Sequence, residues 1–212
     1  MTLRRQASPI FRALRRAHPG AKCSLEFSDP LQLLIATLLS AQCADARVNR
    51  VTPALFRRYR SAADYAEADL AELQSLIRPL GLHRTKARAI RAIGRALVER
   101  FGGRVPDTVE GLTSLPFIGR KSATAVLGNG FGRAEGVTVD THVLRVSRRL
   151  GLAKGRTPLQ VERELMALFP REEWIPLGHT LILHGRKVCQ ARAPRCGECP
   201  VERLCPKRGV RA

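Results

Sequence analysis

The chain has 212 residues, of which 44% are hydrophobic, and 37 Lys and Arg against 18 Asp and Glu give it a formal net charge of +19. A balance this basic points to a polyanionic partner. Nucleic acid is the obvious one, and a membrane surface is the weaker alternative. No apolar run approaches the ~20 residues that span a bilayer, which excludes a membrane-spanning protein, and the length allows one or two domains.

The first 25 residues are rich in arginine and contain no acidic residue, as in a transit peptide. However, Ser8 and Pro9 are typical of a helix start, and Ile10, Phe11 and Leu14 follow as an apolar stripe. We therefore expect a basic helix docked on the rest of the protein.

The following segments are predicted to be helices. Residues 28–30, Ser-Asp-Pro, begin one that continues through LQLLIATLLSAQ, which is apolar nearly all round and hence buried. Asp45 is expected to cap the next helix, and Asp69 with Glu72 to form a capping box for another. TKARAIRAIGRALVERF forms a long basic amphipathic helix that ends at Gly102. Because no alternating strand pattern exceeds a few residues, the sequence predicts an all-α fold.

A tight turn over residues 116–119 leads into a helix that starts near Arg120 or Lys121. Backbone N–H groups at a helix N-terminus attract phosphate. The helix dipole and Arg120 both favour the neutral form of Lys121, and a neutral amine is a nucleophile. The alternative is that Lys121 is one of many solvated lysines.

Asp140 directly precedes another predicted helix, so its default role is that of an N-cap. It is also a carboxylate placed shortly after a candidate nucleophile. An amine together with a carboxylate can perform Schiff-base chemistry at a sugar carbon.

Four cysteines close the chain in the spacing C-x6-C-x2-C-x5-C: Cys189, Cys196, Cys199 and Cys205. Disulfides are disfavoured because the chain is of a cytosolic type. Structural zinc sites usually pair ligands through loops of about two to four residues. Iron–sulfur clusters are also held by four cysteine thiolates, and the longer loops favour such a cluster over zinc without deciding between them. The residues after Cys205 are expected to be loose.

Together these segments resemble the endonuclease III branch of the helix-hairpin-helix DNA glycosylases. The resemblance is carried by LLSAQCADARVN, LPFIGRKSA, VDTHVLRV and LILHGRKVC with the terminal cysteines, and it covers nearly the whole chain in the family's order. The cysteine spacing is the family's own, which implies a [4Fe–4S] cluster. The resemblance also implies a six-helix domain at residues 24–134, a cluster domain formed by residues 1–23 and 135–212, and a DNA cleft between them.

By this resemblance, Lys121 attacks C1′ of a nucleotide flipped out of the duplex, and the resulting Schiff base permits strand cleavage by β-elimination. Asp140 matches the carboxylate that supports the nucleophile, and His142 a residue near the DNA backbone. Gln42 and Leu82 match positions that enter the duplex; otherwise they are an ordinary helix-end amide and an exposed leucine. Further DNA contacts are expected from Pro116, Phe117, Ile118, Gly119, Arg120, Arg192 and Arg195.

One residue departs from the family's pattern. The family's hairpin usually reads L-P-G-[IV]-G, and here Phe117 replaces the first glycine. Glycine allows close backbone approach and a free choice of φ. Either the hairpin is reshaped or the ring contacts DNA.

The sequence thus predicts a bifunctional DNA glycosylase and AP lyase that excises damaged, oxidised pyrimidines in base excision repair. We expect a monomer that is cytoplasmic and nucleoid-associated, binds double-stranded DNA with base lesions or abasic sites, and does not associate with membranes. One rival is a monofunctional adenine glycosylase, against which Lys121 and the end of the chain at Ala212 argue. The other is a weakly active or non-catalytic DNA-binding paralogue, which Phe117 favours.

Overall fold

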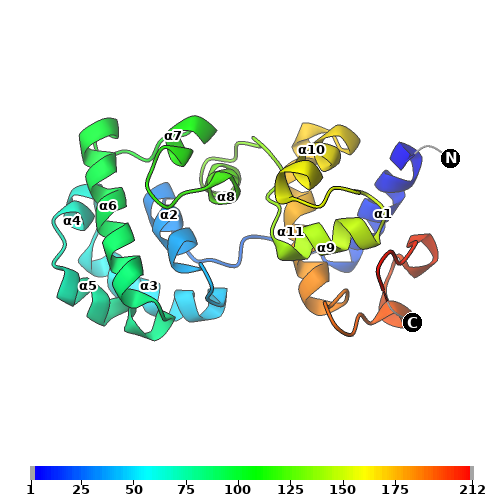
Figure 1. Cartoon of the computed structure of the whole chain (residues 1–212), viewed down its shortest axis with the longest axis horizontal. Helices are drawn as coiled ribbons and strands as arrows, with labels where there is room; N and C mark the ends of the chain where they lie inside the picture. Colours follow the sequence, from blue (N-terminus) through cyan, green and yellow to red (C-terminus); the bar gives the residue numbers. More distant parts are fainter. Residues whose placement is uncertain (1–2, 211–212) are drawn as a thin grey trace. The chain divides into compact units, whose positions relative to one another are not determined.

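The computed structural model describes residues 3–210, and in that range it contains helices and no strand, which confirms the all-α prediction. The chain divides into two compact units (Figure 1). One runs from Cys23 to Arg133 and is called the hairpin unit. The other combines the residues up to Lys22 with those from Ala134 onward and is called the cysteine unit. None of the helices within residues 3–210 has the length and apolar character that crossing a bilayer requires.

The hairpin unit packs its helices around α2, whose central residues are fully buried. Asp29 caps α2 as expected, because its carboxylate accepts a hydrogen bond of 2.8 Å from the Gln32 backbone N–H. The elements of this unit are α2 (Pro30–Leu39), α3 (Asp45–Arg58), α4 (Ala62–Ala66), α5 (Leu70–Ile77), the 3-10 turn η1 (Arg78–Leu80), α6 (His83–Phe101), α7 (Val109–Thr113) and α8 (Arg120–Gly130).

The cysteine unit joins both ends of the chain in one core. From α1, Ile10, Phe11 and Leu14 pack into a cluster that also holds Val143 and Val146 of α9. The elements of this unit are α1 (Leu3–Ala17), α9 (Thr141–Arg149), α10 (Pro158–Leu168), η2 (Arg171–Glu173), α11 (Trp174–Lys187), η3 (Cys196–Glu198) and η4 (Glu202–Leu204).

The start of α1 was predicted wrongly. The helix begins at Leu3 and contains Pro9, instead of starting at Ser8 and Pro9. A proline inside a helix costs about 3 kcal/mol. Burying Ile10, Phe11 and Leu14 at about 1.5–3 kcal/mol each outweighs that cost.

Two helix starts in the hairpin unit also differ from expectation. Ala44, not Asp45, is the N-cap of α3, and no side chain caps it. Asp69 does cap α5 by accepting from the Glu72 N–H. The Glu72 side chain does not complete a capping box, because it accepts instead from Arg58 at 2.6 Å. An ion pair to a bidentate guanidinium competes well with a single backbone N–H.

The expectation that the chain is loose after Cys205 is wrong for residues 206–210. Lys207 forms an ion pair of 2.8 Å with Glu202, and the Arg208 backbone N–H donates to the Arg149 carbonyl at 3.3 Å. Residues 211–212 lie outside the described range. The segment is therefore fastened to the end of α9.

The closest helix packing in the hairpin unit occurs at Gly94 of α6. A Cβ atom there would lie 2.6 Å from the Ala66 backbone nitrogen and 2.8 Å from the Tyr65 carbonyl carbon. Backbone atoms of α4 cannot move aside as a flexible side chain can. Glycine is thus required by packing, although it costs helix stability.

We predict that Gly94→Ala lowers the free energy of unfolding by about 2 kcal/mol, because overpacking outweighs the helix propensity gained. Urea unfolding followed by circular dichroism measures this change. The control is Val98→Ala, an exposed position of the same helix, which should change stability by less than about 0.5 kcal/mol. A stabilising Gly94→Ala substitution would contradict the packing argument.

Candidate active site and metal centre

The hairpin consists of α7, the turn at residues 116–119 and α8, and buried side chains anchor it to the core. Leu112, Leu115 and Ile118 are all buried, and the Ile118 N–H donates to the Leu115 carbonyl at 3.3 Å. Ile118 was expected among the DNA contacts, but its buried side chain leaves only its backbone for a ligand. Pro116 is half-buried in the same turn. The core therefore fixes the position of the turn.

Lys121 is the second residue of α8 and is exposed. Gly119 is the N-cap of this helix, and no side chain caps it. A Cβ atom on Gly119 would meet nothing within 4 Å, so the approach to the helix end is open. Uncapped N–H groups and the helix dipole make this end suited to an anion. An exposed primary amine thus lies in the first turn of a helix whose N-terminal end is suited to an anion.

Phe117 adopts the left-handed conformation, with φ of +64°, and its side chain is 64% exposed. This conformation costs a residue with a Cβ atom about 1–2 kcal/mol, whereas glycine adopts it freely. The exposed ring gains little stability from burial, so contacts within the fold do not offset this strain. An exposed aromatic side chain held in a strained turn indicates a ligand contact.

Two other residues of the hairpin unit share this conformation. Gln42, in the turn after α2, has φ of +53°, and Leu82, at the start of α6, has φ of +48°. Both are exposed, Leu82 to 58%. Non-glycine residues with positive φ in the range 3–210 are Gln42, Leu82, Phe117 and Lys207. Three of the four are residues for which the sequence predicted DNA contact, and strain of this kind gathers at functional sites.

Lys86 was missed by the sequence analysis. It is only 5% exposed, and its Nζ donates to the Leu80 carbonyl at 3.2 Å, next to the turn that carries Leu82. Burial lowers the pKa of Lys86, and the nearby Cys43, adjacent to Gln42, opposes that shift. Lys86 therefore lies close to both exposed turns. The available signal was a lysine on the buried face of α6.

Asp140 is the N-cap of α9. One carboxylate oxygen accepts from the Val143 N–H at 2.8 Å, and the backbone carbonyl accepts from the Leu144 N–H at 2.9 Å. Only one oxygen of this half-buried carboxylate is used for capping. His142, in the first turn of α9, has its Nδ1 3.1 Å from an Arg145 guanidinium nitrogen. Capping therefore leaves the second oxygen of Asp140 available to a ligand.

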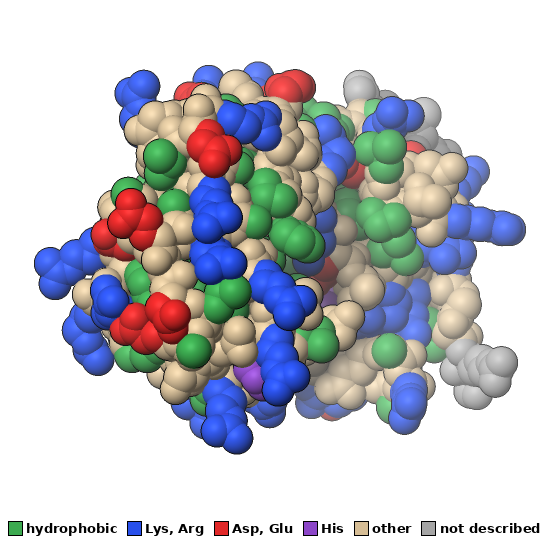
Figure 2. Space-filling model, turned by 60° about the vertical axis from the view of Figure 1, so that its left-hand side comes forward, with side chains coloured by type: hydrophobic (Ala, Val, Ile, Leu, Met, Phe, Trp, Pro, Cys, Tyr) green, Lys and Arg blue, Asp and Glu red, His purple; other side chains and the backbone are tan. Residues whose placement is uncertain are grey.

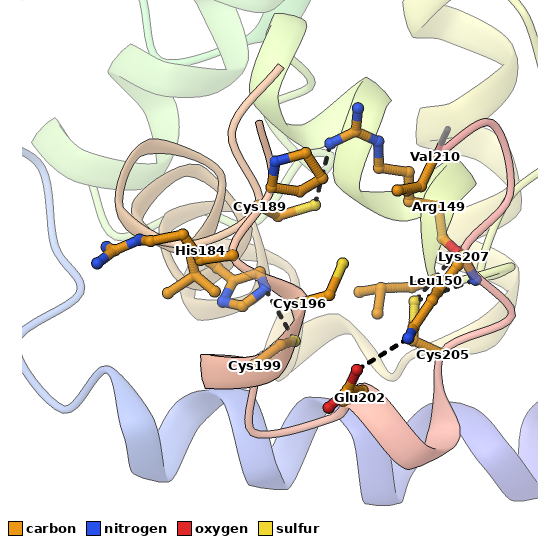
Figure 3. A pocket seen from close by; sticks show the side chains of 13 residues that line it. Arg149, Leu150, His184, Cys189, Cys196, Cys199, Glu202, Cys205, Lys207 and Val210 are labelled. Atoms are coloured by element: carbon orange, nitrogen blue, oxygen red, sulfur yellow. Dashed lines mark hydrogen bonds and ion pairs between the residues drawn. The ribbon is translucent and has the colours of Figure 1, made fainter. Parts of the chain in front are cut away.

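The four C-terminal cysteines line one pocket (Figure 3). Their side chains point toward a shared space from the end of α11, from η3 and from the segment after η4. The cavity between them has a volume of about 20 Å³. Burial raises the pKa of Cys199 and of Cys205, and the neighbouring thiols add to this rise. All six cysteines of the chain are free thiols, Cys23 and Cys43 among them.

Two arginines of α9 hold the last turn of α11 and the chain that follows it. The Arg145 guanidinium donates to the carbonyls of Gly185 and Cys189 at 2.9 and 3.1 Å. Arg149, one helical turn later, donates to the carbonyls of Gln190 and Ala191 at 2.6 and 2.8 Å, and lies 3.5 Å from the Cys189 sulfur. Sequence reasoning missed both. The available signal was two arginines at i, i+4 spacing on one helix face.

A pair of buried histidines borders the cysteine pocket. His18 Nε2 lies 3.0 Å from His184 Nδ1, and His184 Nε2 lies 3.6 Å from the Cys199 sulfur. Burial, with a smaller contribution from His18, lowers the pKa of His184 to about 4. A neutral imidazole has one donor and one acceptor. If Nε2 donates to a Cys199 thiolate, then Nδ1 accepts from His18.

The two arginines of the first cysteine loop differ. Arg195 forms an ion pair of 3.0 Å with Glu198 and donates to the Lys187 carbonyl, which occupies much of its guanidinium. Arg192 is exposed, and no hydrogen bond or ion pair ties its side chain to any residue within 3–210. Arg192 is therefore the better placed of the two for phosphate contact.

The predicted site residues fall into two groups. The hairpin unit carries the six turn and helix residues from Pro116 to Lys121, together with Gln42 and Leu82. The cysteine unit carries the four C-terminal cysteines, Asp140, His142, Arg192 and Arg195. The pairing of Lys121 with Asp140 involves both units and stays a prediction.

The model of the HhH-GPD superfamily of base excision DNA repair proteins matches residues 35–171. The Endonuclease III of Synechocystis sp. is 49% identical over 203 residues, which cover 96% of this chain and 93% of that protein. The chain belongs to the endonuclease III family of this superfamily. The Endonuclease III of Escherichia coli K12 is 41% identical over 196 residues, 92% of each chain.

Solved structures agree with this family assignment. A structure described as a trapped Endonuclease III–DNA covalent intermediate has a TM-score of 0.91 and 41% identity, and the match covers 98% of this chain and 97% of that one. A thermostable thymine-DNA glycosylase, at 20% identity and a TM-score of 0.82, shares the fold. The helix-hairpin-helix glycosylase fold predicted from the sequence is confirmed.

We predict that Phe117→Gly raises the free energy of unfolding by about 1 kcal/mol, because glycine relieves the left-handed strain. Phe117→Ala should leave stability nearly unchanged, since it removes an exposed ring but keeps the Cβ atom. Urea unfolding of both variants checks this difference. Equal stabilities of the two variants would show that residue 117 is not strained in solution.

Proposed function

We infer that this chain is a DNA N-glycosylase and AP lyase of base excision repair. The observation that carries this inference is the match, over nearly the whole chain, to an Endonuclease III whose solved structure is a trapped covalent intermediate with DNA. A covalent intermediate requires a nucleophile on the protein. In this chain an exposed primary amine, Lys121, lies at the uncapped end of α8.

We propose that Lys121 is that nucleophile. Its nitrogen forms a bond to C1′ of the damaged nucleotide while the bond from C1′ to the base breaks, and the base leaves with the bonding pair. Opening of the sugar gives a Schiff base between Lys121 and C1′. Loss of a C2′ proton then expels the 3′ phosphate by β-elimination. The uncapped N–H groups of α8 support this assignment, because they would hold a neighbouring phosphate in place.

Asp140 is proposed as the carboxylate of this reaction. One of its oxygens caps α9, which fixes the carboxylate, and the second is free of that duty. A negative charge held there would stabilise the positive charge that develops on the sugar and accept a proton from Lys121.

Gln42, Leu82 and Phe117 are proposed to contact the opened duplex. Their exposure and their left-handed backbone support this role, because an exposed side chain on a strained, well-anchored turn is presented rigidly to a ligand. Leucine can wedge between base steps, and an amide can fill the space of a flipped base. Figure 2 shows basic side chains over much of the visible face, which suits the phosphate backbone.

We propose that Cys189, Cys196, Cys199 and Cys205 hold a [4Fe–4S] cluster. The donor set fits, since four thiols line one pocket. A single zinc ion needs its sulfur ligands about 2.3 Å from its centre. Within residues 3–210, no three Cys, His, Asp or Glu side chains are grouped so as to hold one ion. When bound, the cluster supplies iron–thiolate bonds that fasten the C-terminal segment.

The proposed substrate is double-stranded DNA with oxidised pyrimidines or abasic sites, bound by a monomer. The curated relatives come from bacteria, which supports action on the nucleoid in the cytoplasm. The rival function is a weakly active or non-catalytic DNA-binding paralogue, and the strained Phe117 in the hairpin turn is the observation that favours it.

Lys121→Gln should abolish covalent trapping by borohydride on an abasic duplex and change DNA affinity by less than about threefold, because only the nucleophile is removed. Gel analysis of trapped complexes and fluorescence anisotropy measure the two quantities. Lys22→Gln, which also removes an exposed lysine, is the control and should trap like wild type.

Asp140→Asn keeps a capping oxygen and should slow base excision roughly 100-fold or more at unchanged stability. If neither wild type nor Phe117→Gly forms a trapped complex with the abasic duplex, the chain is instead a weakly active or non-catalytic DNA-binding paralogue.

The purified protein should be yellow-brown, with broad absorbance in the blue and four iron atoms per chain, as the [4Fe–4S] proposal requires. Cys199→Ser should lose the colour and part of the folded structure, because metal binding and folding are linked. Cys43→Ser, which removes a half-buried free thiol of the hairpin unit, should keep both. Colourless wild-type protein with one zinc ion per chain would show the proposal to be wrong.

A further inference from the structure

An open hollow of about 440 Å³ lies in the cysteine unit, along the second half of α9. Five cationic side chains line it: Arg145, Arg148, Arg149, Lys154 and Arg208. No acidic side chain is among the residues that form its wall. A concave surface lined by charges of one sign concentrates the electrostatic potential and raises the local concentration of counter-ions.

The five cations play two different parts. The guanidinium groups of Arg145 and Arg149 donate to backbone carbonyls, so these two side chains are held in place in the wall of the hollow. Arg148, Lys154 and Arg208 are exposed, and no carboxylate within residues 3–210 forms an ion pair with any of them. These three charges can therefore turn toward an anion in the hollow without giving up a partner.

The acids of the neighbouring segments are already committed. The Glu164 carboxylate accepts from the backbone N–H groups of Lys154 and Gly155 at 2.6 and 3.2 Å. Glu202 is paired with Lys207 at 2.8 Å. Neutralisation of the hollow must therefore come from outside these segments.

The hollow is completed by the segment that follows the last cysteine. A Cβ atom on Gly151 would lie 3.1 Å from Pro206 and 3.7 Å from the Arg208 guanidinium carbon, so glycine permits the two segments to approach closely. The Arg208 N–H donates to the Arg149 carbonyl at 3.3 Å, and the Cys205 sulfur lies 3.4 Å from the same oxygen. Fastening of Cys205 thus brings Arg208 to the hollow.

We propose that this hollow binds a phosphate group of a nucleic-acid backbone, as a second contact separate from the site of base excision. Arg148 lies eight residues after Asp140 on α9, about 12 Å along the helix, so the two sites cannot hold the same phosphodiester. Guanidinium groups match phosphate geometry well. The open form and exposed cations suit a continuous polyanion better than a free phosphate ion, which an enclosed site would hold. This inference rests on the proposed function in one respect only, namely that the ligand is a nucleic acid.

The test compares two triple variants of the cluster-loaded protein with equal change of charge. Arg148→Gln, Lys154→Gln and Arg208→Gln remove the free cations of the hollow. Arg12→Gln, Arg15→Gln and Arg16→Gln remove three exposed arginines of α1 in the same unit. Affinity for an undamaged duplex of about 20 base pairs is measured by anisotropy between about 50 and 200 mM KCl.

The hollow variant should bind the duplex about tenfold more weakly at the lower salt concentration. Its slope of log affinity against log salt should fall by about 0.9, because one lost phosphate contact removes about that much. The α1 variant should keep the wild-type slope. Equal slopes for the two variants would overturn the proposal by showing an effect of net charge alone. Saturable binding of inorganic phosphate by wild type, lost in the hollow variant without any change of the DNA slope, would also overturn it in favour of a free-anion site.

Two further readouts separate this proposal from others. Visible absorbance of the variants reports whether the cluster is kept. If the triple variant loses it, Arg148→Gln and Lys154→Gln singly, both at exposed positions, should each lower the slope by up to about 0.9. Borohydride trapping on an abasic duplex should persist in the hollow variant. Failure of wild type to trap would count against the enzymatic function and leave the salt measurement unaffected.

Discussion

The hydrogen bonds from Arg149 to the chain after α11 are the interaction on which the cysteine unit depends. Arg149 is a buried residue, only 8% exposed, so its guanidinium must satisfy its donors inside the protein. It does so with the carbonyls of Gln190 and Ala191 and with a contact to the Cys189 sulfur. Hydrogen bonds that involve a charged group contribute roughly 1.5–3 kcal/mol each. The same side chain lines both the cysteine pocket and the basic hollow, so α9 is the common support of the two features.

The hairpin unit combines an apolar core with strained turns. Its core is apolar, and α2 is buried along most of its length. That core tolerates Gln42, Leu82 and Phe117 in left-handed conformations, at about 1–2 kcal/mol each. Strain of this size persists only where the surroundings determine the backbone. Exposed, strained turns held by a buried core are consistent with turns that must keep their shape when they contact a ligand.

Much of this could be predicted from the sequence because it depends on local chemistry. Asp29 and Asp140 cap the helices that follow them, as side-chain oxygens at those positions should. The cysteine spacing indicated one shared pocket. Lys121 was expected within the first turn of its helix and is there.

The remaining features depend on tertiary contacts whose partners a local pattern does not identify. Pro9 lies inside α1 because distant residues bury that helix. Arg145, Arg149 and Lys86 were not singled out in the sequence, yet each donates to a backbone carbonyl of another segment. The left-handed conformation of Phe117 contradicts its residue type, so the sequence could only indicate that the turn departs from the family.

The order of the chain has a consequence for synthesis. Residues 23–133 form one compact unit that is synthesised before residue 134 and those after it, whereas α1 is synthesised earlier still and can contact α10 and α11 only after both have been made. Until then, the apolar face of α1 carrying Ile10, Phe11 and Leu14 has no core to join. Domains generally fold as units during synthesis, N-terminal parts first. Here the first helix must wait, and chaperone binding to nascent chains should concentrate on it.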